Sequence, residues 1–179
     1  ANVVTSGFKK SYSEETQSRD VHIPGTLNTR AMPISKANNV VDMTPGAMMI
    51  SGRALDIYVN EKGAIAVQGP EGQDLYTRRG DLSVSSAGMM VTGKGDLVLG
   101  DSGPITIPEG TNISIANDGT INMVPIGANQ AVQVGRIKLV DTANEQMLIR
   151  EDGLYQLAQG QLQASAEVKI TPKALEGSN

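Results

Sequence analysis

Residues 112–123 read NISIANDGTINM, and this stretch holds the clearest secondary-structure signal in the chain. Isoleucines alternate with polar residues on both sides of the pair Asp118-Gly119. Alternation with a period of two is typical of a half-buried strand, and Asp-Gly supplies two residues that tolerate positive φ. The stretch therefore predicts a β-hairpin. Its inward-facing residues would be Ile113, Ile115, Ile121 and Met123.

Similar short apolar runs, most of them bounded by turn residues, occur on both sides of this hairpin. Residues 55–59 and 65–67 flank the turn sequence NEKG and predict a second hairpin. The other runs lie at residues 75–77, 82–84, 89–91, 97–99, 105–107, 137–139, 152–157 and 167–170. We therefore expect a mainly β fold, a compact β-rich body of short antiparallel strands and hairpins with little helix.

The pattern divides the chain into three parts. Residues 1–54 predict an N-terminal segment of loops and isolated strands that packs on the body, with one short helix near residues 13–18. Residues 55–170 form the predicted β-rich core domain, and residues 171–179 form a C-terminal segment. Nothing repeats at a fixed period of about 20 to 50 residues, so the sequence does not support a propeller or a solenoid.

Composition excludes several functional classes. The 179 residues include one Phe, four Tyr, no Trp and eight Met, so the core depends on aliphatic side chains and methionine. A net charge of −4 and a pI near 5.0 supply no basic surface for nucleic acid. The chain has no cysteine and therefore no disulfide or thiolate nucleophile. No apolar run reaches the roughly 20 residues of a membrane span, and no signal peptide is visible.

Residues 88–96, GMMVTGKGD, come within one residue of a phosphate-binding Walker A loop. Gly88, Gly93 and Lys94 have the required spacing, but Gly95 replaces the hydroxyl residue that would bind magnesium. A working loop also needs a following helix whose amides face the phosphates. Here an alternating, strand-like run follows, so we interpret the stretch as two β-turns.

Two further motifs have ordinary explanations. Arg79-Gly80-Asp81 spells a tripeptide that cell-surface receptors read, yet a charged turn between strands is the better explanation. Asn112 begins a glycosylation acceptor pattern beside a predicted strand. We interpret both as chance matches.

The sequence predicts no catalytic residue, no metal site and no cofactor. His22 is the only histidine, which excludes a two-histidine metal site. The carboxylate pairs Asp96 with Asp101 and Glu151 with Asp152 are expected at turns on the surface, because nearness in sequence does not make them face each other. No small-molecule substrate is expected.

Three stretches resemble the flagellar rod and hook family, the axial proteins of the bacterial flagellum. The start, ANVVTSGFKK, resembles the end of the family's N-terminal segment, and residues 175–179, LEGSN, resemble the entry to its C-terminal helix. Because family members extend beyond both points as helices, the resemblance implies a core fragment without them. The longest match is carried by Leu55, Asp56, Gly63, Tyr76, Thr77, Arg78, Gly80, Gly88, Val91, Thr92, Gly95, Leu99 and Gly100.

Within this family, residues 41–49 (VDMTPGAMM) and 105–121 favour a proximal rod subunit, with a distal rod subunit as the alternative. The resemblance implies a structural role in a drive shaft that crosses the periplasm and transmits motor torque to the hook. It also implies export by the flagellar type III apparatus without a cleavable signal peptide. Its partners would be the distal rod protein and other proximal rod subunits, and the isolated core would be monomeric.

Four charged residues are the candidates for contacts between subunits. Arg78, Arg79, Asp81 and Lys94 are expected on solvent-facing turns of the β body. Ordinary surface charges would look the same in the sequence. A different class of function, a secreted β-rich adhesin or binding module, would instead use the Arg79-Gly80-Asp81 turn. A carbohydrate-active enzyme would need aromatic side chains on which sugar rings stack, and only 3% of the residues are aromatic.

Overall fold

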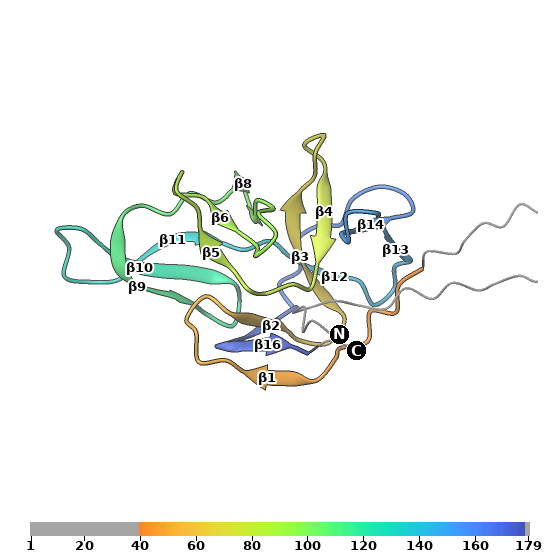
Figure 1. Ribbon diagram of the computed structural model, residues 1–179, viewed down its shortest axis with the longest axis horizontal. Coiled ribbons are helices and arrows are strands. Elements are labelled where there is room, and N and C mark those ends of the chain that lie inside the picture. The colour runs from red at the N-terminus through yellow and green to blue at the C-terminus, as the bar shows by residue number, and fades with distance from the viewer. Residues whose placement is uncertain (1–39, 178–179) are drawn as a thin grey trace, which may run out of the picture.

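The computed structural model of the chain describes residues 40–177 (Figure 1). These residues form strands and turns and contain no helix, which confirms the mainly β prediction. Accordingly, nothing in this described part could cross a membrane as a helix. The helix predicted near residues 13–18 lies outside the described residues, as do residues 1–39 in general and residues 178–179.

A five-stranded antiparallel sheet forms the centre of the molecule, in the order β12-β3-β4-β14-β13. Successive side chains of β3 point to opposite faces, so Ile65 joins one apolar cluster while Ala64 and Ala66 join another. All three are fully buried, because β3 is covered on both faces. The strands are β3 (Gly63–Gln68), β4 (Asp74–Thr77), β12 (Leu139–Asp141), β13 (Met147–Ile149) and β14 (Tyr155–Leu157).

A three-stranded sheet contains the predicted 112–123 hairpin and extends to one side in Figure 1. β9 (Gly110–Ile115) pairs with β10 (Thr120–Pro125), which also pairs with β11 (Val132–Arg136), so the hairpin is confirmed. Its turn differs in one detail. Only Gly119 has a positive φ, 90°, whereas the Asp118 carboxylate accepts a hydrogen bond from the Thr120 amide at 3.0 Å.

Four two-stranded ribbons complete the described fold. Two of them join segments from opposite ends of the chain, β1 with β16 and β2 with β15. The other two, β5 with β6 and β7 with β8, are local. The strands are β1 (Met48–Ile50), β2 (Ile57–Val59), β5 (Ser83–Val84), β6 (Met90–Val91), β7 (Leu99–Gly100), β8 (Gly103–Pro104), β15 (Ile170–Pro172) and β16 (Ala174–Glu176).

The predicted hairpin between residues 55–59 and 65–67 is wrong. The turn exists, since the Gly63 amide donates to the Asn60 carbonyl at 3.2 Å. However, β2 pairs with β15, while β3 pairs with β4 and β12. The alternation of Ile57 and Val59 was assigned correctly, and both side chains are fully buried. A pattern of buried positions identifies a strand but not its partner.

The C-terminal segment pairs with a strand from the N-terminal part of the described chain. Residues 174–176 form strand β16. Met48 pairs with Glu176 in this ribbon, and the Gly177 amide donates to the Ala47 carbonyl at 2.8 Å. The described parts of the two terminal segments therefore hydrogen-bond to each other. The proposed division at residues 54 and 170 remains a prediction.

The core is mostly aliphatic, as the composition predicted. The larger cluster lies between β2, β3 and the β9–β10 hairpin. On the other face of β3, Tyr76 lies opposite Tyr155 in the central sheet, and both are buried. The Leu162 amide donates to the Tyr76 hydroxyl oxygen at 2.8 Å. Burial raises the pKa of Tyr76 above its ordinary value.

Candidate functional site

Arg78, the residue that follows β4, is wholly buried, with 1% of its surface exposed. Its Nε lies 3.1 and 3.2 Å from the two carboxylate oxygens of Glu176. Its Nη1 donates to the carbonyls of Glu61, at 2.9 Å, and Gly63, and its Nη2 donates to the Val59 carbonyl. One guanidinium therefore joins the ends of β2, β3, β4 and β16.

The surroundings of Glu176 complete this buried cluster, which we call the Arg78 site. Glu176 accepts the Gly46 amide at 2.5 Å, and the Tyr58 hydroxyl donates to the Gly46 carbonyl at 2.9 Å. The Tyr58 ring centroid lies 6.0 Å from Arg78 Cζ, at the limit of a cation–π contact. Burial raises the pKa of Tyr58, against the lowering effect of Arg78, so the hydroxyl stays protonated and donates.

The prediction that Arg78 faces solvent is therefore wrong. A buried charge is tolerated only when it is paired and hydrogen-bonded, and Glu176 with the surrounding carbonyls provides these partners. A side chain in this position cannot touch a neighbouring subunit. The Arg78 site is instead a structural clamp that holds the C-terminal strand and the Gly46 loop on the body.

Arg79 and Asp81 pair with each other at the surface. Arg79 Nε and Nη2 donate to the two oxygens of Asp81 at 2.7 and 3.0 Å, and the side chains are 22% and 27% exposed. Between them, Gly80 has no room for a side chain, because a Cβ there would overlap the Ile57 carbonyl. An added Cβ at Gly93 would overlap the Asp81 carboxylate. The tripeptide is therefore a packed, self-neutralised turn and does not present both charges to a receptor.

The near match to a Walker A loop consists of two β-turns, as predicted. The Gly88 amide donates to the Ser85 carbonyl at 2.9 Å, and the Gly95 amide donates to the Thr92 carbonyl at 2.8 Å. Strands and not a helix follow these turns. Lys94 is exposed and donates to the Asp152 carbonyl from the turn after β13. This arrangement offers no row of amides to a phosphate.

Acid–base and metal chemistry gain no support from the described residues. Asp152 is paired with Arg150 at 3.2 Å, and the two side chains are half-buried at the β13–β14 turn. No cluster of three or more metal-ligating side chains occurs within residues 40–177. His22 lies outside the described residues.

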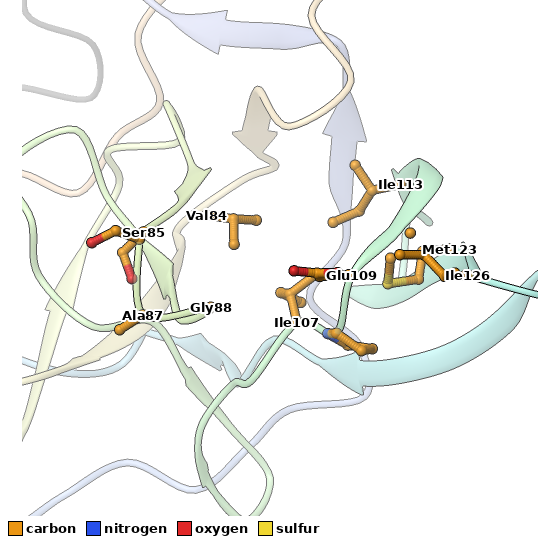
Figure 2. Close-up of a pocket in the computed structure, with 12 residues that line it drawn as sticks. Val84, Ser85, Ala87, Gly88, Ile107, Glu109, Ile113, Met123 and Ile126 are labelled. Carbon is orange, nitrogen blue, oxygen red and sulfur yellow. The ribbon is translucent and has the colours of Figure 1, made fainter.

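An apolar groove lies between the β5–β6 hairpin and the β9–β10 hairpin (Figure 2). It has a volume of about 680 Å³, and apolar side chains make up most of its lining. Sequence reasoning missed it, because its walls come from separate hairpins. Two of its large apolar residues are exposed in the structure, Val84 at 39% and Ile126, just after β10, at 73%. The apolar lining residues are Val84, Ala87, Ile107, Pro108, Ile113, Met123 and Ile126.

Comparison with known proteins first defines the class. The family description "Flagellar hook protein FlgE/F/G D1 domain" matches residues 58–123, the part from β2 to β10. That stretch includes Arg78, the Arg79–Asp81 pair, Lys94 and most of the groove. This part of the β body is therefore similar to the D1 domain of the flagellar FlgE, FlgF and FlgG proteins.

Individual relatives narrow the assignment. The flagellar basal-body rod protein FlgF of Escherichia coli (strain K12) is 37% identical over 189 residues, covering 100% of this chain and 73% of the relative. FlgF of Salmonella typhimurium is 36% identical with the same coverage. FlgG of Buchnera aphidicola subsp. Acyrthosiphon pisum is 31% identical over 96% of this chain and 69% of the relative. The chain belongs to the FlgF family of flagellar basal-body rod proteins.

Proposed function

We propose that the chain is a structural subunit of the proximal flagellar rod, the part of the drive shaft that carries motor torque through the periplasm towards the hook. The observation that carries this proposal is the 37% identity with a rod protein FlgF along the whole chain. The FlgF match has higher identity than the FlgG match, 31%, which favours the proximal over the distal rod.

The physical properties of the body suit a load-bearing role that involves no catalysis. β3 is buried on both faces, and the Arg78 site ties four strand ends together. Closely packed interiors have low compressibility and transmit strain. A torque applied to one face would therefore reach the opposite face with little deformation. Such a function needs no cofactor, no metal and no small-molecule substrate.

The partners we propose are other rod subunits and the flagellar type III export apparatus. In a helical tube each subunit meets its neighbours through different faces. Lys94 remains a candidate contact, since it is exposed on a turn. The half-buried Arg79–Asp81 pair is a second candidate, whereas Arg78 is withdrawn because it is buried. We further propose export without a cleavable signal peptide and a location in the periplasmic rod.

An adhesin is the competing function, and the surface argues against it. Its receptor-binding turn would be Arg79-Gly80-Asp81, yet Arg79 and Asp81 hydrogen-bond to each other twice. A receptor would have to break both bonds before it could bind either charge.

Deletion of the full-length gene in its source organism tests the proposal. Motility is scored, and isolated basal bodies are imaged by electron microscopy. A proximal rod role predicts non-motile cells whose rods stop before the distal segment, with rescue by the intact gene. Swimming cells with normal filaments would overturn it.

A further inference from the structure

The groove is an apolar site with few polar groups to orient a ligand. Among its lining residues, polar side chains come only from Ser85, Ser86 and Glu109. The Ser85 hydroxyl oxygen already accepts the Met89 amide at 3.2 Å. Small-molecule sites usually combine an apolar lining with several convergent polar groups. The groove instead suits a partner that offers apolar side chains on an extended backbone.

Strand β1 has the complementary character. Met48 is 49% exposed and Ile50 is 77% exposed, although both are large and apolar. Residues i and i+2 of a strand share one face, so these two side chains form a ridge. Within the described residues β1 pairs only with β16, and its other edge is open for strand addition. In Figure 1 β1 runs along the bottom of the molecule, while β5 and β6 lie above the β9–β10 hairpin.

The charges beside these two features are also complementary. Glu109 lies in the groove next to Ile126, whose amide donates to the Glu109 carbonyl at 3.2 Å. Lys173 lies at the end of β1, where its carbonyl accepts the amides of Ser51 and Gly52 at 2.9 and 3.2 Å. Both charged side chains are exposed, and neither has an ion-pair partner within residues 40–177. If the ridge of one copy lay in the groove of another, Lys173 of the first would come close to Glu109 of the second.

We infer that the groove receives strand β1 of a second copy of this chain. The contact is heterologous, because ridge and groove are different surfaces, and such contacts build open helical polymers when they do not close into a ring. This inference rests on the proposed rod function and adds a defined subunit contact to it. Three strand residues bury far less than the about 1,200–2,000 Å² of a stable interface. The isolated chain is therefore monomeric when dilute, and the contact forms where copies are crowded.

Thiol cross-linking tests the contact directly, because the chain contains no cysteine. The single variants Ile50→Cys and Ile126→Cys, one of them carrying a mass tag, are mixed at the highest soluble concentration and oxidised. We expect the disulfide between the two different variants to form at least fivefold faster than the homodimer of either variant. Glu145→Cys, on the exposed turn between β12 and β13, serves as the control partner for each.

A charge exchange adds specificity to the test. Lys173→Glu in the Ile50→Cys chain should slow the cross-link at low salt, and Glu109→Lys in the Ile126→Cys partner should restore its rate. Far-ultraviolet circular dichroism confirms that each variant is folded. Equal rates for all pairs of variants, a dominant homodimer of the Ile50→Cys variant or a lack of charge rescue would overturn the inference. The gene deletion is scored separately, so a rod defect without this cross-link leaves the proposed function intact.

Discussion

Arg78 and Arg79 are neighbours in the sequence, yet they belong to two differently built regions. Arg78 is buried and pairs with Glu176, 98 positions away. Arg79 is partly exposed and pairs with Asp81, two positions away. The same contrast separates the Arg78 site from the hairpin lobe, by which we mean residues 83–136. The first depends on distant segments meeting, whereas the second consists largely of turns that close locally.

This difference separates stability from surface function. Removing a group from the Arg78 site exposes several strand ends at once, so we expect an effect on the whole fold. The groove and its exposed rim lie in the hairpin lobe, where many changes leave the distant pairing intact. The following predictions test this division, beginning with the largest expected effect.

Replacing Arg78 with alanine should destabilise the protein most. Glu176 would remain buried without its cation, and the carbonyls of Val59, Glu61 and Gly63 would lose their donors. Breaking a buried ion pair costs about 3–5 kcal/mol. Urea denaturation measures the loss. Arg78→Met combined with Glu176→Met should recover part of it, because no unpaired charge remains. An Arg78→Ala variant as stable as the parent protein would refute the clamp.

Gly119→Val should destabilise the protein through the turn of the β9–β10 hairpin. Gly119 has φ of 90°, and its added Cβ would lie 3.1 Å from the Ile137 carbonyl oxygen. Backbone strain of this kind costs about 1–3 kcal/mol, and the close contact adds to it. Gly95→Val is the matched control, since Gly95 has φ of 92° but open space around its Cβ position. Equal thermal midpoints for the two variants would exclude the packing contribution.

The turn at Gly119 and the buried Arg78 differ in how far the sequence predicts them. The hairpin at residues 112–123 was predictable, because its turn and both strands lie within a dozen residues. The partner of β2 was not, since β15 is more than a hundred positions away and no local pattern marks it. Arg78 was placed on the surface because arginine is seldom fully buried. Only the arrival of Glu176 makes its burial favourable, and the sequence carries no local sign of that pairing.

The surface features show the same limit. The two turns of residues 85–95 were interpreted correctly, since each is closed by a hydrogen bond between residues three apart. Lys94 was placed correctly on the surface. The groove was missed, because Val84, Ile107 and Ile126 come from three separate segments. The groove exists because separate hairpins pack against each other, and the apolar–polar pattern of a single strand does not predict that packing.

The Arg79–Asp81 pair should contribute little to stability. Its two hydrogen bonds are well formed, but partly exposed ion pairs contribute about 0.2–1 kcal/mol. A double-mutant cycle with Arg79→Ala and Asp81→Ala isolates this coupling energy. A coupling as large as that of Arg78 with Glu176 would remove the contrast between local and distant pairing.

The smallest effect concerns pH. The backbone amide of Thr120 holds the pKa of Asp118 below its ordinary value. A lowered folded-state pKa gives stability that is present above the unfolded pKa, about 3.9, and is lost as pH falls through the folded value. Asp118→Asn should therefore lose slightly less stability than the parent protein between pH 5 and pH 2. Urea midpoints across this range check the slope. An unchanged slope would mean that the hydrogen bond from Thr120 to Asp118 does not contribute to the pH dependence of stability.

The position of Glu176 has a consequence for how the chain acquires its fold. A chain made from its N-terminus releases Arg78 from the ribosome 98 residues before Glu176. Until Glu176 is made, the guanidinium lacks its carboxylate partner. The Arg78 site is therefore completed by one of the last described residues, whereas the turns of the hairpin lobe can close before that residue is made.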